Sequence, residues 1–436
     1  MKLLALIGIA MPVFAQYGGP AILSRGEAPS AMMGPQLAFR PFVEVNGVYS
    51  TGLSGVTVDS SGNIANRHGA GLNVTAGLSG SHGWRHTTVG MSFRGGYSTY
   101  FGHSGYNSTD ISMNLGVVHQ VSRHISLTWN NSMGIFNRDA GLLASISPAV
   151  PFDPNQTYVP TTDFFNNRTI FYSSQLGMVI QKSTRLSFSL NGGIFENHRA
   201  SDALYGVLGE NATADMQYRL TKRATIGAAY SYSHYGYSRI ASNTNGQGAA
   251  ATFAYQLSHW WEFSGLFGFT RVETKFIQNV PVDPAIAAII GISQSSQIVY
   301  SVRYIPNVSA RLSRTFHKGV LFFAAGYGMT PGNGLFLTSE SLTANVGYTY
   351  TGLRRWSFGA LASYQDAHSI GNVYGSYGGE TASIHASRQF FRTIHMVAAV
   401  DGHRYSSGNF SKYNQTVYTA SLGLGWSPGD VPLRIW

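Results

Sequence analysis

Four side chains near the C-terminal end are of the types that bind metal ions or transfer protons, namely His385, His395, Asp401 and His403. Converging imidazole and carboxylate groups are typical ligands of Zn²⁺. The segments that carry them alternate apolar and polar residues, which predicts β-strands with all four side chains on the polar face. However, His395 and His403 lie eight residues apart, which is roughly 26 Å along a strand. We therefore interpret the four as a polar lining and expect no metal site.

A second chemistry to consider is hydrolysis by a serine–histidine pair. Such a site needs both side chains on the same face of neighbouring strands. His119 falls on the apolar face of the segment 109–122, and no convincing serine partner shares that face. We predict no catalytic residue and no cofactor, and the chain is not expected to be an enzyme.

The N-terminus has the pattern of a secretory signal peptide. Lys2 precedes an apolar run that ends at Phe14, and Val13 and Ala15 are the small residues before a cleavage site. The run is too short for a membrane-spanning helix, which needs about 20 residues, and no apolar run of about 18 residues follows it. We predict a signal peptide at residues 1–15 and a Gly/Pro/Ser-rich segment at 16–35. The chain has no cysteine, so disulfides do not hold it together.

Long alternating segments fill the rest of the chain. In the segment 185–198, for example, Leu186, Phe188 and Leu190 alternate with serine and asparagine, which is the period of a strand. These segments are twice as long as the ~5–6 residues usual in soluble proteins, and a strand that crosses a membrane needs about 9–11. The predicted strands are 37–52, 69–82, 87–101, 109–122, 124–136, 167–181, 185–198, 206–220, 223–236, 247–258, 261–274, 297–313, 318–330, 339–352, 355–367, 377–390, 394–406 and 414–427.

Short turns and longer loops connect these segments in strict alternation. The loops are 53–68, 102–108, 137–166, 199–205, 237–246, 275–296, 331–338, 368–376 and 407–413. Tight turns on one rim and long loops on the other are typical of transmembrane barrels. The sequence therefore predicts an all-β fold, a transmembrane antiparallel up-and-down β-barrel of 18 strands. A count of 16 is also possible, because the segment 318–330 is apolar on both faces.

Aromatic residues gather at both ends of the predicted strands, as expected where a barrel meets the two interfaces of a membrane. At the turn end they are Trp84, Trp260, Trp261, Tyr348, Tyr350 and Trp356. At the loop end they are Tyr97, Phe101, Tyr230, Tyr232, Tyr235 and Tyr237.

With these features the chain resembles a Gram-negative outer-membrane β-barrel of the porin type, over essentially all of the mature chain. The resemblance implies a barrel at 36–427 in the cell outer membrane, with 16–35 and a C-terminal tail at 428–436 in the periplasm. It also implies contact with outer-membrane lipids and with the barrel-assembly machinery, which reads a C-terminal aromatic residue in such barrels. Trp426 and Trp436 both qualify for that role.

Positive charge gathers in the tight turns, at Arg85, Arg123, Lys182, Lys222, Arg223, Lys318, Arg354, Arg355 and Arg392. No Asp or Glu lies within these turns, so most of the net charge of +10 belongs to one rim. We interpret this rim as facing anionic lipid headgroups. A rim is not the basic groove of a nucleic-acid-binding protein, and we expect no such partner.

Successive side chains of a strand point alternately to the two faces of the sheet, and we call this alternation parity. Counted from the apolar outer positions, it predicts eight charged side chains inside the barrel: Arg40, Glu44, Arg94, Asp215, Arg219, Glu262, Arg303 and Arg311. Such a mixed set either braces the lumen by pairing or tunes ion selectivity. Arg303 and Arg311 are the best selectivity candidates. Two loops are candidates to enter the lumen: 137–166, which is the longest, and 275–296, whose apolar run Asp283–Ile290 suits a short plugging helix.

Barrels of 16–18 strands leave a water channel, whereas small ones are filled by side chains. The first expectation is therefore a channel for passive or weakly selective passage of small solutes. The alternatives are an export barrel for an acidic exopolysaccharide and a structural or adhesive barrel without transport. The sequence does not set the oligomeric state.

Overall fold

The computed structural model of the chain describes residues 38–53, 68–103, 106–136, 168–200, 204–281, 294–332, 334, 337–350, 352–370, 375–407, 414–428 and 431–432. The predicted signal peptide, the segment 16–35, the loop 137–166 and the run Asp283–Ile290 lie outside these residues. No helix in the described part of the chain is long and apolar enough to cross a membrane.

Every strand in the described ranges belongs to one sheet. The first nine are β1 (Ala38–Ser50), β2 (Gly69–Gly83), β3 (Thr87–Tyr100), β4 (Ser108–Gln120), β5 (Ile125–Phe136), β6 (Thr169–Gln181), β7 (Leu186–Arg199), β8 (Val207–Arg219) and β9 (Ala224–Tyr237). The others are β10 (Asn243–Gln256), β11 (Trp261–Pro281), β12 (Gln294–Phe316), β13 (Gly319–Thr330), β14 (Ser339–Tyr350), β15 (Trp356–Ser369), β16 (Ser376–Gln389), β17 (Ile394–Ser407), β18 (Gln415–Trp426) and β19 (Val431–Pro432).

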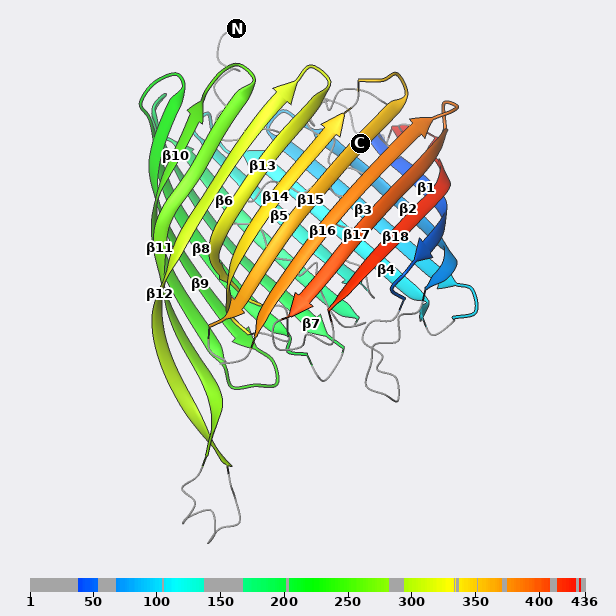
Figure 1. The fold of residues 1–436 in the computed structure, drawn as a ribbon. Helices are drawn as coiled ribbons and strands as arrows, with labels where there is room; N and C mark the ends of the chain where they lie inside the picture. The colour runs from blue at the N-terminus through cyan, green and yellow to red at the C-terminus, as the bar shows by residue number, and fades with distance from the viewer. Residues whose placement is uncertain are drawn as a thin grey trace.

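Each long strand pairs antiparallel with the next along the chain, and β18 returns to β1. The closing register runs from Val43 opposite Trp426 to Ser50 opposite Thr419. The wall is thus a closed up-and-down barrel of 18 long strands, so the count of 18 is confirmed and the alternative of 16 is wrong. In Figure 1 the tight turns lie at one end of the barrel and the longer connections at the other. We call these the turn end and the loop end.

Alternation along each strand separates the two faces of the wall. On β1, Phe42 and Glu44 are buried, whereas Val43 and Val45 are exposed. Side chains on the concave inner face converge and cover one another, while those on the convex outer face diverge. The apolar half of each alternating segment is therefore the outer half, opposite to the arrangement in a soluble protein.

The C-terminal tail departs from its prediction. Residues 428–436 were expected to leave the barrel after the last strand, because Pro432 disfavours a strand. Instead, Val431 and Pro432 form the two-residue strand β19, which pairs with Phe39 and Ala38 of β1. Pro432 is tolerated because it lies at the very end of the pairing. Trp426 ends β18 and points outward, and Trp436 lies outside the described residues.

Two neighbouring strands are much longer than the others. β11 has 21 residues and β12 has 23, and the two pair along their whole length. They form a hairpin that projects beyond the loop end (Figure 1). The sequence predicted a loop over 275–296, so strand structure replaces both flanks of that loop. The run Asp283–Ile290 between these flanks lies outside the described residues, so its entry into the lumen stays a prediction.

Candidate functional site

The eight charged residues predicted to face the lumen have the parity of the buried, inner-face positions on their strands. Glu44 itself is buried, and Ser313 and Ile305 are buried on the same face of β12 as Arg311 and Arg303. The structure brings some of these charges together and keeps others apart. Whether they set selectivity stays a prediction.

One charged cluster spans β1, β3 and β4. Arg94 lies partly buried on the inner face and interacts electrostatically with Glu44 and with Asp110. In the register of these strands Gly77 lies opposite Arg94, and Gly96 lies opposite Asp110. Asn46 also donates a hydrogen bond to Glu44. A single guanidinium thus compensates two carboxylates in the wall.

Asp110 was missed at the sequence level, although it falls on the inner face of a predicted strand. Parity alone would have placed it inside the barrel. Its partnership with Arg94 depends on the register between β3 and β4, which alternation does not give.

A second pair, Glu262 and Arg311, lies near the turn end of β11 and β12, and these side chains interact electrostatically. The Arg311 guanidinium also lies 5.9 Å from the centre of the Phe322 ring. Arg303, the other selectivity candidate, is eight residues away on β12, which is about 26 Å, and its side chain is exposed at the loop end. The structure therefore does not bring Arg303 and Arg311 to one constriction.

The remaining polar candidates also lie on the inner wall. Ser189 donates a hydrogen bond to Asp215, with 2.8 Å between the two oxygens. His395, Asp401 and His403 are buried on the inner face of β17, and His385 lies opposite Ala399. Within the described ranges, no three His, Cys, Asp or Glu side chains are grouped to hold a metal ion. On the outer face, His119 Nδ1 lies 2.8 Å from Thr87 Oγ1.

The loop end is narrowed by an element that the sequence did not predict. β12 pairs with β13 only from Val308 to Phe316, although β12 begins at Gln294. Beyond that point β13 and β14 turn to the inner side of β10–β12. Met329 and Tyr327 pack there against Val272 and Ile305, and Gly246 leaves space for the Met329 side chain. We call Tyr327–Thr330 together with the described part of the β13–β14 connection (331, 332, 334, 337 and 338) the infold.

A chain of buried hydroxyl groups holds the infold to β9 and β10. Tyr237 Oη donates to the carbonyl oxygen of Pro331 at 3.1 Å and lies 2.7 Å from Thr338 Oγ1. Thr338 Oγ1 in turn lies 2.6 Å from Thr244 Oγ1. Leu337 completes the contact by packing among Phe195, Val207, Tyr235 and Tyr237. Because these polar groups are buried, losing one partner leaves the other unsatisfied, at a cost of about 1–3 kcal/mol.

Arg199 fixes the tip of the infold. Its side chain is only 1% exposed, and its Nη1 donates to the carbonyl oxygen of Tyr205 at 2.8 Å. The Tyr205 amide donates to the carbonyl oxygen of Gly334 at 2.9 Å. Gly334 has a φ of +89°, and a Cβ there would lie 2.7 Å from Arg199 Cζ. Both its backbone conformation and its contact with the guanidinium therefore require glycine.

Two tyrosines assigned to the outer aromatic girdle belong to this site instead. Tyr235 and Tyr237 lie on the inner face of β9 and are buried. Their girdle assignment was wrong, because it followed their position at the strand end and ignored alternation. Tyr230 and Tyr232, which have the opposite parity, are outward.

Engineered cysteines provide a direct check of the infold. The chain contains no cysteine, so T244C/T338C would carry its only two thiols. The present Oγ–Oγ distance of 2.6 Å places the Cβ atoms near the ~3.5–4.5 Å that a disulfide needs. We expect an intramolecular disulfide in the oxidised protein, measured by mass spectrometry after thiol alkylation. T75C/T338C is the matched control, because Thr75 lies on the far-removed β2, and it should keep both thiols. Free thiols in T244C/T338C would contradict the infold.

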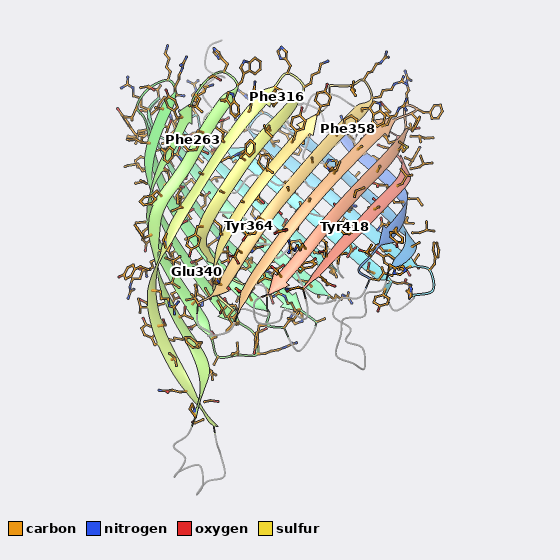
Figure 2. All side chains as sticks on the ribbon, viewed as in Figure 1. Phe263, Phe316, Glu340, Phe358, Tyr364 and Tyr418 are labelled. Atoms are coloured by element: carbon orange, nitrogen blue, oxygen red, sulfur yellow. The ribbon has the colours of Figure 1, made fainter. Side chains whose placement is uncertain are left out.

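The outer wall has an apolar band between two polar borders. Leu176, Ile384 and Leu422 are among its most exposed side chains. At the loop end the border carries surface contacts such as Arg404–Glu380, 3.6 Å, and His368–Asp366, 3.3 Å. Figure 2 shows Phe263, Phe316 and Phe358 at the turn end, and Tyr364 and Tyr418 nearer the loop end.

Residues of both predicted borders are exposed, and their role at a membrane stays a prediction. The girdle residues Trp84, Trp260, Tyr97 and Phe101 are exposed. The nine basic residues of the predicted rim are all exposed in or beside the tight turns. Their contact with lipids stays a prediction.

No protein-family model and no curated protein matches the chain. Solved structures with a similar shape include OccK2 (OpdF) from Pseudomonas aeruginosa, at 11% identity and a TM-score of 0.43, covering 90% of this chain and 98% of that one. The copper transporter OprC is 9% identical with a TM-score of 0.43, covering 91% and 66%. The ferric-catecholate import receptor Fiu from E. coli K12, in its open form, is 9% identical with a TM-score of 0.42, covering 88% and 81%. These similarities are too low to carry an argument about function.

Proposed function

We propose that this chain is an outer-membrane channel that lets small polar solutes pass through its lumen. The observation that supports the proposal best is the closed 18-strand wall, with polar and charged residues inside and an apolar band outside. An apolar outer band suits lipid. A wall of 18 strands is also wider than its own side chains can fill.

The turns and loops give the orientation of the barrel. Short turns face the periplasm and longer loops face the outside in such barrels. The infold therefore lies at the extracellular mouth, where it narrows the entrance. Solutes would enter past the infold and leave at the turn end, near the paired Glu262 and Arg311.

Charge pairing along the lumen favours weak rather than strong ion selectivity. Arg94 is balanced by Glu44 and Asp110, and Arg311 by Glu262, so neither cation acts as a free charge on a passing ion. Selectivity in pores usually comes from rings of like charge. We therefore expect a channel that passes both anions and cations.

Planar-bilayer recording of the refolded full-length chain tests this function. The expected result is stepwise conductance with a reversal potential close to zero in a salt gradient. Protein that has been heat-denatured serves as the control for leak. If folded protein inserts, as judged by protease protection, but passes no current, the channel proposal is wrong and a structural or adhesive barrel is favoured.

A further inference from the structure

A short pattern occurs twice at the turn end of the barrel. Arg314-Thr-Phe316-His-Lys318 ends β12, and Arg388-Gln-Phe390-Phe-Arg392 ends β16. Both read Arg, any residue, Phe, any residue, then Lys or Arg. In each case the register places the arginine directly opposite a tryptophan that begins the preceding strand, Trp261 or Trp356.

Each arginine is held between two aromatic rings on the outer face. Arg314 Cζ lies 5.1 Å from the centre of the Trp261 ring and 4.6 Å from that of Phe316. Arg388 Cζ lies 5.1 Å from the Trp356 ring and 4.8 Å from that of Phe390. These distances are within the range of cation–π contacts. The rings fix the guanidinium at the wall, and the N–H groups on its edge stay available for an acceptor.

Among the residues that the structure describes, neither arginine has an acidic partner. The structure gives neither one a salt bridge among the described residues, and the nearest acid to the first, Glu262, lies on the opposite face and interacts with Arg311. Nε of Arg314 is buried and has no hydrogen-bond partner within the described ranges. Lys318 and Arg392 add an exposed second cation four residues further on. Both places therefore combine an arginine held by two rings with a second cation close by along the chain.

We propose that these two aromatic-flanked arginines are binding sites for the phosphate group of anionic phospholipids in the periplasmic leaflet. A guanidinium edge matches the oxygens of a phosphate in a bidentate arrangement. The flanking rings belong to the turn-end girdle, which is the level of the headgroups. Because the sites point away from the lumen, they bind lipid rather than a passing solute. The inference rests on the proposed membrane orientation but not on conduction.

Native mass spectrometry of the refolded full-length chain tests the sites, with phosphatidylglycerol as the probe and phosphatidylcholine as the neutral comparison. We expect R314Q/R388Q to lose phosphatidylglycerol binding by about fivefold per site, since a basic residue near an anionic surface contributes about 1 kcal/mol. R123Q/K182Q is the matched control, because it removes two exposed turn cations without ring partners. Both cations belong to the basic rim, so this control should lose some lipid binding, but less than R314Q/R388Q, because it removes the same charge without an aromatic-flanked guanidinium.

Two further experiments distinguish the contribution of the arginine charge from that of the aromatic rings, and binding of a lipid from binding of a free anion. F316L/F390L keeps both arginines and should still weaken phosphatidylglycerol binding, which keeps the test valid if R314Q/R388Q does not fold. Inorganic phosphate should not displace the lipid, because it lacks the acyl chains that bury against the apolar band. Equal lipid retention in R314Q/R388Q and R123Q/K182Q would overturn the proposal. Displacement by inorganic phosphate would overturn the assignment to lipid. The single-channel conductance of these variants tests the proposed channel function independently of lipid binding.

Discussion

Replacing Gly334 by valine is expected to release the infold and to increase the single-channel conductance. The new side chain would collide with the Arg199 guanidinium, whose Cζ is 2.7 Å from where a Cβ would lie. Displacing residue 334 breaks the hydrogen bond from the Tyr205 amide to its carbonyl oxygen, which destabilises the narrowed mouth by about 2 kcal/mol. That is roughly a 30-fold shift toward the released state, at 1.4 kcal/mol per tenfold. Planar-bilayer recording should show either a larger single-channel conductance throughout or frequent transitions to a larger conductance level.

Gly102→Val provides the matched control for this change. Gly102 also has a positive φ, +72°, but nothing lies within 4 Å of its Cβ position. It therefore carries the same backbone strain at the loop end without the collision. If both variants conduct like the original chain, the infold does not narrow the pore. The oxidised T244C/T338C protein, with Gly334→Val added, should return to the small conductance.

Replacing Arg94 by glutamine should give the largest loss of stability among the charged lumen residues. The change leaves two carboxylates, Glu44 and Asp110, without their shared cation. Removing one partner of a buried ion pair typically costs about 3–5 kcal/mol, which is an upper bound here because Arg94 and Asp110 are only partly buried. The urea midpoint of the detergent-refolded barrel should fall accordingly, and the reversal potential in a potassium chloride gradient should shift toward cation preference.

Arg303→Gln is the control for this loss, because Arg303 is exposed at the loop end. A surface substitution of this kind usually changes stability by no more than about 0.5 kcal/mol. The double variant E44Q/R94Q should recover part of the stability, since residues in contact do not act additively. An unchanged urea midpoint in Arg94→Gln would show that the cluster does not brace the wall.

The order and positions of the strands could be predicted because nearly every wall strand has one apolar and one polar face. Alternation alone placed β7 at 185–198, and the structure has Leu186–Arg199. The exceptions have physical reasons. β10 begins at Asn243 instead of 247, because asparagine and glycine at its start hid the pattern. β11 and β12 run on beyond the predicted loop boundary because they pair with each other outside the apolar band.

The infold could not be predicted, because it arises where two strands fail to pair. Its one signal in the sequence was the segment 318–330, which is apolar on both faces. The structure explains this pattern: Val320 and Phe322 are buried on one face, while Tyr327 and Met329 pack against the inner side of β10–β12 on the other. A strand covered on both sides needs two apolar faces.

Alternation along the strands predicted which face each charged side chain occupies, but it could not predict which charges lie next to one another. Glu262 and Arg311 meet because Glu262 lies opposite Ser313 and Ser264 lies opposite Arg311, and only register decides that. The same limit explains why Arg303 and Arg311 seemed equivalent. They share a face of β12, but among the described residues an acidic neighbour, Glu262, is found for Arg311 alone.

The β11–β12 hairpin extends further from the barrel than the other described strands (Figure 1). Past Lys275, β11 has no partner on β10, and its six further residues to Pro281 extend about 20 Å at the usual strand rise. On β12 the stretch from Gln294 to Asn307 has no partner on β13. In the orientation proposed above, an antibody or a protease approaching from outside would reach this arm before the mouth of the barrel. Cleavage near its end would leave β11 and β12 anchored by their neighbours, so the barrel would survive the loss of its most accessible part.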